Sequence, residues 1–386
     1  MANPRRFLLP PGIGRALDKI KKLDDRGFLY YMEYKADYYK LEKYVDLITK
    51  PACTSFVTKA LDGDTLFARN YDFCHWRYNR RGEPKDITGL AIVVHCTNKK
   101  AKYRSLGVVD AFWLDVNKGR FFEGTLSDKK TDITLMGAAP FAIMDGINDQ
   151  GLAVSIMHLP TENQWQETDY IDFNTLTDEE RRLAKLYDKP GEVPPRLDYT
   201  VKKGAVAINT ADRKSWRVNK NFAVAQNNPC KRTLIHPVLM RKMLDFCANV
   251  DEAVELAKSV NVRSPMPDND YHIMVCDKTG KAVVLEWVSN KLNIIETDRC
   301  TNYYLTREDH YGYGYERFDI VSACLKKYKK GMSPELAMRT LQLASQNVIE
   351  GSDVSMTQWS SLYDLDRGTL KLSLLADYSK YYEFKI

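Results

Sequence analysis

The amino-acid sequence predicts an α+β fold in which antiparallel sheets are covered by helices. Short apolar or alternating runs are joined by tight turns, and Asp62-Gly63 is a strong hairpin signal. Amphipathic helical segments are grouped between these blocks of strands. Because strands and helices do not alternate one by one, this order favours layers of antiparallel sheet over a parallel βαβ series.

Length and composition are those of an ordinary globular protein. The 386 residues are enough for one large domain or two medium ones with a well-filled core. A hydrophobic share of 44% and a charged share of 28% exclude disorder over most of the chain. The formal net charge of +6 is spread along the whole length, which does not indicate a nucleic-acid binder.

Targeting signals and cysteine spacing favour a cytoplasmic protein. The residues from Met1 to Gly12 lack the long apolar core of a signal peptide. No stretch approaches the roughly 20 apolar residues of a membrane helix. None of the eight cysteines forms a C-x-x-C pair, so neither a zinc knuckle nor a thioredoxin motif is indicated. We expect unpaired thiols in a reducing cytoplasm and no metal or other cofactor.

The predicted elements begin with an N-terminal helical segment. Residues 14–49 carry apolar side chains at helical spacing, and Pro51 ends this segment. From Cys53 onward the period changes to short β-like runs. The polar segment 161–200 is expected to be a surface excursion with a helix starting near Thr177.

The other predicted elements complete the strand blocks and the helices. Strands are expected at 54–58, 65–69, Leu90–His95, Leu106–Ala111, Ile133–Leu135, Leu152–Met157, Tyr271–Cys276, Lys281–Trp287, Ser361–Leu365 and Leu370–Leu375. Amphipathic helices are expected over about 236–260 and over about 315–347, the second with a break at Gly331.

One local group of residues, around Cys53, could support nucleophilic catalysis. The hairpin that begins at Cys53 would return Arg69 and Asp72 to the side of this cysteine, because a hairpin brings its two ends together. If Cys53 were the first residue of the mature chain, its own α-amine, with an ordinary pKa of roughly 7.7–8.0, could deprotonate the thiol. By local spacing alone, however, a buried cysteine beside a surface ion pair is the better interpretation.

The wider sequence reverses that interpretation. Cys53-Thr-Ser, followed by Arg69-Asn-Tyr-Asp72, resembles the N-terminal signature of the choloylglycine hydrolase family, in the N-terminal nucleophile hydrolase superfamily. That family contains bile salt hydrolases and penicillin V acylases, and acid ceramidase-like amidases are relatives. The resemblance continues in the same order at Gly146–Pro160, His272–Glu286, Thr301-Asn302, Tyr315–Phe318 and Thr357–Asp364, and it extends over residues 53–386.

The resemblance implies a four-layer αββα sandwich of two antiparallel sheets and a role for each matched residue. Cys53 would attack a substrate carbonyl and form a thioester, which water then hydrolyses. Asp72 and Arg69 would position and tune the amine and the thiol. Asn302 would donate its side-chain amide to the oxyanion, and Arg317 would support the charge around the nucleophile.

Two features depart from the family pattern. A donor near His158 would complete the oxyanion hole, although bile salt hydrolases usually carry Asn and penicillin V acylases Tyr at this position. The second departure is the leader of 52 residues ahead of Cys53. Ceramidase-like relatives have a leader that the same cysteine cuts off, so we expect autocatalytic cleavage between Ala52 and Cys53. The helical leader, residues 1–52, would then be a propeptide that stays bound; the alternative is a plain N-terminal helix in an uncut chain.

The resemblance implies hydrolysis of a linear carbon–nitrogen amide bond. Candidate small-molecule substrates are conjugated bile acids, N-acyl amino acids or lactones, fatty-acid amides and penicillin V. An acyltransferase that uses the same thioester and a non-catalytic binding module on the same fold are the alternatives. The pocket candidates are Phe73, Trp76, Tyr78 and Phe141, which lie near predicted loops. The sequence leaves open whether the protein forms a homo-oligomer.

Overall fold

The structure is a computed structural model, and it describes most of the chain. The described residues are 13, 16, 20–25, 27–44, 52–73, 77–78, 84–85, 91–114, 133–160, 217–218, 224–225, 230–264, 269–288, 291–307, 309–346 and 356–386. The predicted excursion at 161–200, with its helix near Thr177, lies outside them.

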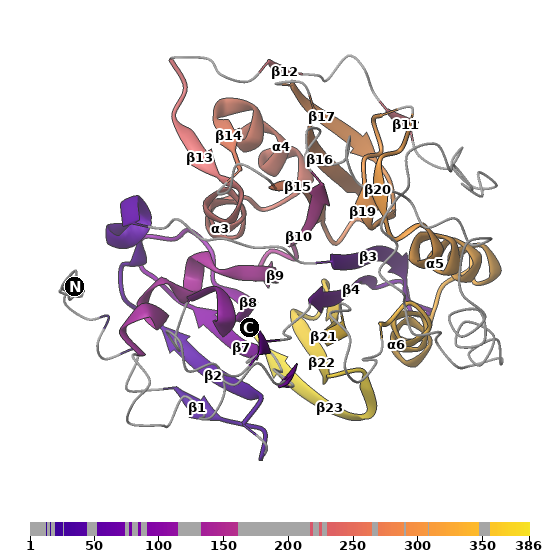
Figure 1. Cartoon of the computed structure of the whole chain (residues 1–386), viewed down its shortest axis with the longest axis horizontal. Coiled ribbons are helices and arrows are strands. Elements are labelled where there is room, and N and C mark those ends of the chain that lie inside the picture. The colour runs from indigo at the N-terminus through magenta and orange to yellow at the C-terminus, as the bar shows by residue number, and fades with distance from the viewer. Residues whose placement is uncertain are drawn as a thin grey trace.

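Two main sheets dominate the fold (Figure 1). The larger sheet has 11 strands: β1 (Lys21–Lys22), β2 (Leu29–Tyr34), β7 (Ala91–Cys96), β8 (Ser105–Asp110), β9 (Ile143–Asn148), β10 (Ala153–Pro160), β15 (Asn269–Cys276), β16 (Ala282–Val288), β17 (Lys291–Glu296) and β11 (Arg217–Val218), with β12 (Val224–Ala225) also paired to β17. The smaller sheet has six: β18 (Arg299–Cys300), β3 (Ala52–Lys59), β4 (Thr65–Phe73), β21 (Met356–Asp364), β22 (Thr369–Leu374) and β23 (Asp377–Lys385). Every pairing in these two sheets is antiparallel except that of β2 with β7.

Minor elements complete the described part. They are the strand pairs β5 (Arg77–Tyr78) with β6 (Pro84–Lys85), β13 (Thr233–Ile235) with β14 (Asn261–Arg263) and β19 (Asn302–Tyr303) with β20 (Gly312–Tyr313), and the 3-10 helices η1 (Tyr38–Tyr44), η2 (Ala111–Leu114) and η3 (Ile133–Phe141).

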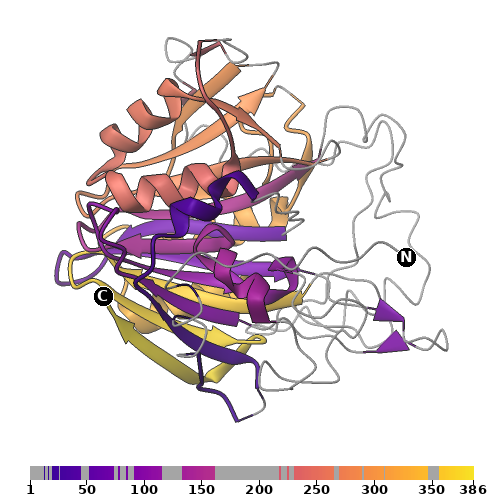
Figure 2. The ribbon, with the colours of Figure 1, turned by 90° about the vertical axis from the view of Figure 1, so that its left-hand side faces the viewer.

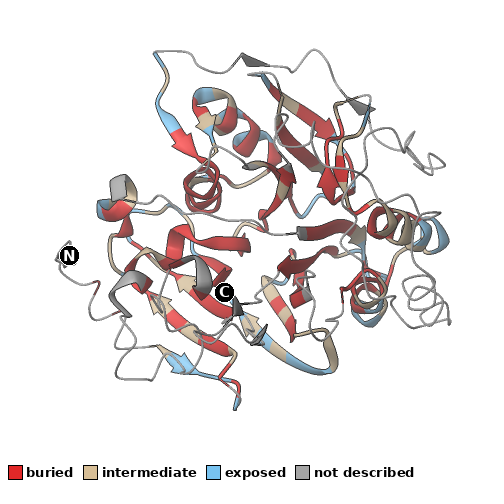
Figure 3. Ribbon diagram, in the orientation of Figure 1, coloured by how far each residue is buried: buried red, intermediate tan, exposed pale blue. Residues whose placement is uncertain are grey.

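The predicted four-layer αββα sandwich is confirmed. Helices α3 (His236–Phe246) and α4 (Val250–Ser259) pack on the larger sheet, and α5 (Tyr315–Lys327) and α6 (Pro334–Leu343) pack on the smaller one (Figure 1). The two sheets face each other, and Ser55 Oγ on β3 lies 2.9 Å from Ser155 Oγ on β10. Strands inside the sandwich are buried almost throughout, whereas β1 and β23 at the margins carry exposed residues (Figure 3).

Most predicted elements have their expected type. The β3–β4 hairpin turns at Gly63, whose φ of 98° favours glycine, and every residue of β4 is buried because one face meets the larger sheet and the other meets α6. The predicted helix at 236–260 is two helices, since Asn249 caps the start of α4 through the amide of Glu252. The break in the second predicted helix at Gly331, with φ 123°, is confirmed.

Two predicted elements are wrong. The segment 14–49 is not one helix, because Leu29–Tyr34 form β2 beside β7 and Tyr38–Tyr44 form η1. Its aromatic and apolar side chains fit strand packing as well as a helical stripe, and the pairing with β7 decides. The predicted strand at Ile133–Leu135 is the start of η3. None of the helices in the described part of the chain combines the length and hydropathy of a membrane span.

The N-terminal segment belongs to the folded core. Met32 and Tyr34 are fully buried in β2, and Tyr34 Oη donates to the carbonyl of Gly137 at 2.7 Å. The hydroxyls of Tyr38 and Tyr39 both donate to Asp245 Oδ2 on α3, at 2.5 and 2.6 Å. Figure 2 shows η1, in indigo, beside α3. A strand of the larger sheet and a helix contact therefore come from residues ahead of Cys53.

Met32→Ala should lower the free energy of unfolding by about 2–5 kcal/mol, because it deletes a fully buried side chain from β2. The shift of the urea midpoint at constant m-value measures this loss. Glu33→Ala, in the same strand but with a side chain 40% exposed, is the matched control and should change the free energy by less than about 0.5 kcal/mol. An unchanged midpoint for Met32→Ala would contradict the packing of this strand in the core.

Candidate active site

Cys53 lies at the start of β3 with its side chain between the two sheets. It is fully buried, and its partner across the hairpin is Tyr71 on β4. The same register pairs Ser55 with Arg69 and Ala52 with Asp72, so the hairpin returns both predicted partners to the cysteine. Arg69 Nη2 donates to Cys53 Sγ at 2.9 Å. The predicted contact between Arg69 and the thiol is therefore present.

Arg69 is held by a carboxylate on the opposite sheet. Its Nη1 donates to Asp145 Oδ2 on β9 at 2.5 Å, and its Nη2 also donates to the carbonyl of Ile156 at 2.8 Å. Side chains of β21 supply further donors to Asp145: Trp359 Nε1 at 3.1 Å, Ser361 Oγ at 3.0 Å and the hydroxyl of Tyr363. These contacts hold Asp145 in place, and Asp145 in turn holds the guanidinium of Arg69 in one orientation toward the sulfur of Cys53.

Arg317 on α5 forms hydrogen bonds to three of the other predicted site residues, Cys53, Asp72 and Asn302. Its Nη1 donates to the carbonyl of Cys53 at 2.5 Å and to Asp72 Oδ2 at 3.1 Å, and both side chains of this ion pair are fully buried. Its Nη2 donates to Asn302 Oδ1 at 2.8 Å. Thr357 Oγ1 holds the other oxygen of Asp72 at 2.5 Å. A buried charge needs such partners to offset its desolvation.

Asn302 sits at the centre of the polar contacts around the cysteine. Its Oδ1 accepts the amide N–H of Cys53 at 2.7 Å, and its Nδ2 donates to the carbonyl of His158 at 2.9 Å. The imidazole of His158 does not meet the sulfur in any described contact; its Nδ1 lies 2.9 Å from the hydroxyl of Tyr313. His158 therefore reaches the site through its main chain.

Burial controls the charge state of the nucleophile. Desolvation raises the pKa of the Cys53 thiol to about 11 from its ordinary value of 9.0, and the carboxylate of Asp72 adds to this rise. The guanidinium of Arg69 opposes it through its charge and its hydrogen bond. In the uncut chain the thiol is therefore protonated at neutral pH.

Two of the four predicted pocket residues, Phe73 and Phe141, have described side-chain contacts. Phe141 is fully buried with its ring against Tyr38 and Tyr39, at centroid distances of 5.6 and 5.9 Å. Phe73 stacks on Tyr71 at 6.4 Å. Trp76 and the side chain of Tyr78 lie outside the described residues.

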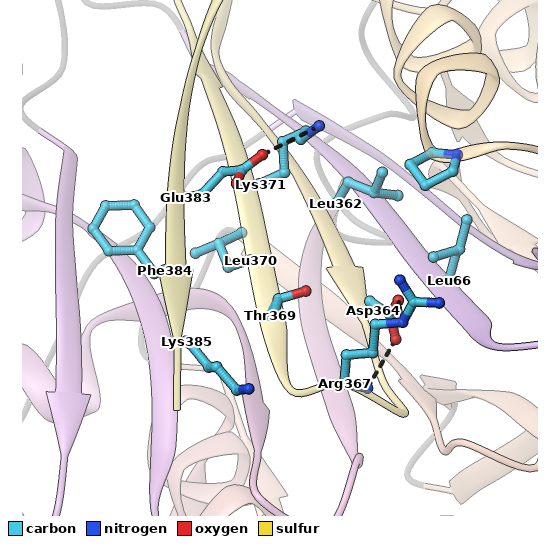
Figure 4. Close-up of a pocket in the computed structure, with 11 residues that line it drawn as sticks. Leu66, Leu362, Asp364, Arg367, Thr369, Leu370, Lys371, Glu383, Phe384 and Lys385 are labelled. Atoms are coloured by element: carbon cyan, nitrogen blue, oxygen red, sulfur yellow. Dashed lines mark hydrogen bonds and ion pairs between the residues drawn. The ribbon is translucent and has the colours of Figure 1, made fainter.

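A described cavity lies away from the cysteine. It holds about 410 Å³ and lies over β4, β21, β22 and β23 beside the start of α6 (Figure 4). Its rim carries the Lys371–Glu383 and Arg367–Asp364 ion pairs, and none of the site residues above lines it. Among the described residues, no group of three or more His, Cys, Asp or Glu side chains could hold a metal ion.

Sequence reasoning missed the residues that hold the predicted ones in place. Asp145 directly precedes the matched Gly146–Pro160 motif, and Thr357 and Trp359 lie inside the matched motif near the C-terminus. The carboxyl of Asp145 stands in the mostly apolar strand Ile143–Asn148, which is a usable signal of a buried polar contact, whereas Thr357 and Trp359 stand in a mixed strand that carries no such signal. Their partners, 76 to 285 residues away in sequence, could not be named from it.

Comparisons with known proteins find similarity only among solved structures. No family model and no curated protein matches the sequence. Two variants of conjugated bile acid hydrolase from Clostridium perfringens match with TM-score 0.46 and 14% identity, over 86% of this chain and 92% of theirs. Penicillin V acylase from Agrobacterium tumefaciens matches with TM-score 0.46 and 13% identity, over 86% of both chains. These are enzymes of the two kinds that the resemblance of the sequence names.

In the uncut chain, Cys53 should react with iodoacetamide at least about 100-fold more slowly than an exposed thiol at pH 8, because its raised pKa of about 11 lowers the thiolate fraction and its side chain is buried. The rate should rise about tenfold per pH unit as the thiol begins to ionise. Mass spectrometry of the peptide that still contains the Ala52–Cys53 bond measures this rate in the uncut chain, with the exposed Cys230 as internal reference. Equal labelling of both cysteines at pH 8 would contradict the buried, protonated thiol.

Proposed function

We propose that the protein is an amide hydrolase that forms a thioester on Cys53 once this residue is the first of its chain. The observation that carries the proposal is the arrangement around Cys53: Arg69 donates to its sulfur at 2.9 Å, and Asn302 and Arg317 hold its amide and its carbonyl. Positive charge this close to the sulfur stabilises the thiolate, which is the reactive form of a cysteine nucleophile.

The reaction uses the free amine of Cys53 as the base. The amine takes the thiol proton, and the sulfur attacks the carbonyl carbon of the substrate amide. The carbon–nitrogen bond breaks, the departing amine takes the proton, and the acyl group stays on the sulfur. Water then hydrolyses the thioester and releases the carboxylic acid. Arg69 stabilises the thiolate at both stages, and Asp72 with Arg317 fixes the main chain of Cys53.

Asn302 and the main chain at His158 would form the oxyanion hole. Asn302 Nδ2 carries the hydrogens that an oxyanion would need, and in the uncut chain it donates to the carbonyl of His158. Along β10, Ile156 and His158 direct their carbonyls to Arg69 and Asn302. The N–H and the C=O of one residue in a strand point to the same edge, so the amide of His158 also points to this edge. Both donors would meet the oxygen of a carbonyl attacked by Cys53.

Cleavage before Cys53 is part of the proposal, because the nitrogen of an uncut Cys53 is a peptide nitrogen and cannot act as a base. The thiol would add to the carbonyl carbon of Ala52, and its proton would pass to the nitrogen of Cys53 as the Ala52–Cys53 carbon–nitrogen bond breaks. Water would then hydrolyse the thioester between Ala52 and the sulfur. Residues 1–52 would stay bound, since β2 is buried in the larger sheet and Tyr38 and Tyr39 are bonded to Asp245.

Purified protein should give two polypeptides by mass spectrometry, residues 1–52 and 53–386, which co-elute in gel filtration. Cys53→Ala should give one intact chain and no hydrolysis, because both reactions use the same sulfur. The substrate panel is glycine- and taurine-conjugated bile acids, penicillin V, N-acyl-homoserine lactones and N-acylethanolamines. Intact wild-type protein with full activity would refute the cleavage step alone. Processed protein that hydrolyses none of the panel and forms no acyl-Cys53 would refute the amidase assignment.

Asn302→Ala should lower kcat by about 10²–10³-fold with a much smaller change in KM, because one oxyanion donor is lost. Steady-state kinetics on the best substrate of the panel measures the effect. Ser322→Ala is the control. It removes a buried hydroxyl of the same helix as Arg317, and this hydroxyl donates only to the main-chain carbonyl of Phe318. A loss in KM alone would mean that Asn302 binds the substrate without stabilising the transition state.

A further inference from the structure

His272 and Glu286 form a buried pair beside the catalytic cluster. They are direct partners on β15 and β16, and both side chains are fully buried. Nδ1 of His272 lies 3.2 Å from Glu286 Oε2, and its Nε2 lies 2.6 Å from the carbonyl of Thr301. A carbonyl can only accept, so Nε2 carries a proton and donates to Thr301.

Glu286 holds the other end of the same segment. Its Oε2 accepts the amide of Leu305 at 2.9 Å, and its Oε1 accepts the amide of Thr306 at 2.9 Å together with the hydroxyl of Thr306. One pair of side chains therefore fixes the chain at Thr301 and again at 305–306. Asn302 lies between these two points, and the carbonyl held by His272 belongs to the peptide bond that leads into it.

A second nucleophile is the competing interpretation of this cluster. Cys300 Sγ lies 3.2 Å from His272 Nε2, which together with Glu286 resembles a cysteine–histidine–carboxylate set. The geometry excludes it, because Nε2 is already protonated toward Thr301 and cannot accept a thiol proton. Cys300 is also fully buried, and burial raises the pKa of its thiol well above 9.0. The pair acts on the main chain and not on a substrate.

We propose that His272 and Glu286 are positioning residues that set the place of the Asn302 side chain in the oxyanion hole. This rests on the proposed function and deepens it. Asn302 makes short contacts to Cys53, Arg317 and the carbonyl of His158, so a small shift of its main chain moves a donor away from the reacting carbonyl. A misplacement of about 1 Å can lower a rate by about 10²-fold.

Two substitutions at His272 separate the contact with Thr301 from the contact with Glu286. The amide nitrogen of Gln matches the place of Nε2, so His272→Gln keeps a donor for Thr301, whereas His272→Asn keeps only a donor near Nδ1. We expect His272→Asn to lower kcat by about 10²-fold with KM within about threefold, and His272→Gln to stay within about fivefold of wild type. Glu286→Gln, which places an amide hydrogen against main-chain donors, is the second variant and should also lower kcat.

Hydrogen exchange measures positioning without any substrate. The amides of 302–306 should exchange about tenfold faster or more in His272→Asn and in Glu286→Gln, and near the wild-type rate in His272→Gln. Asn148→Ala is the matched control: this buried side chain of β9 fixes the α3–α4 connection through the carbonyls of Leu244 and Cys247, and it should lower Tm but not kcat.

The outcomes separate the two proposals. Faster exchange and a fall in kcat that His272→Gln restores would support the positioning role. Equal kcat for His272→Asn and wild type, or an equal fall in the Asn148→Ala control, would overturn it. If wild-type protein hydrolyses no substrate of the panel, the amidase proposal fails; unchanged exchange at 302–306 in His272→Asn would overturn the positioning role in that case too.

Discussion

The pairing of buried charge is the constraint on which the rest of the structure depends. Arg69 and Arg317 are fully buried, and so are their carboxylate partners Asp145 and Asp72. Leaving one of these ions without its partner would cost several kcal/mol, because the interior cannot replace its hydration. Each guanidinium therefore has one permitted place, from which Arg69 Nη2 donates to the sulfur of Cys53 and Arg317 Nη1 donates to its carbonyl. The cost of burying the charges is what makes the site rigid.

The residues around Cys53 also connect the two sheets through hydrogen bonds. Arg69 projects from the smaller sheet and meets Asp145 on the larger one, and three side chains of β21 cross to the same carboxylate. Hydrogen bonds from several side chains to one buried carboxylate specify the spacing and the register of the two sheets more sharply than apolar packing does, because a hydrogen bond tolerates little change in distance or direction. The αββα sandwich and the geometry around Cys53 therefore form together. A change that slides one sheet would also turn the guanidinium away from the sulfur.

The features that could be predicted from the sequence are those that depend on interactions between residues close together in the chain. The Asp62-Gly63 turn fixes the β3–β4 register, so the return of Arg69 and Asp72 to Cys53 needed only local rules. Asp145 and Thr357 complete the cluster through contacts that no local pattern carries. The apolar spacing of the segment 29–34 fits both the helical and the strand period, so the sequence predicts a helix there. Its strand state depends on a parallel pairing with β7, about 60 residues away, which single-sequence periodicity does not contain.

In the uncut chain both ends of the Asn302 side chain are hydrogen-bonded within the protein. Its Oδ1 accepts the amide of Cys53, and its Nδ2 donates to the carbonyl of His158. An unpaired buried donor would cost about 1–3 kcal/mol, so these contacts stabilise the buried side chain. Breaking the bond before Cys53 would change one partner only, from a peptide N–H to an amine. Because Arg317 holds the carbonyl of Cys53 and Asn302 holds its nitrogen, the cluster can keep its form while the nitrogen gains the lone pair that a base requires.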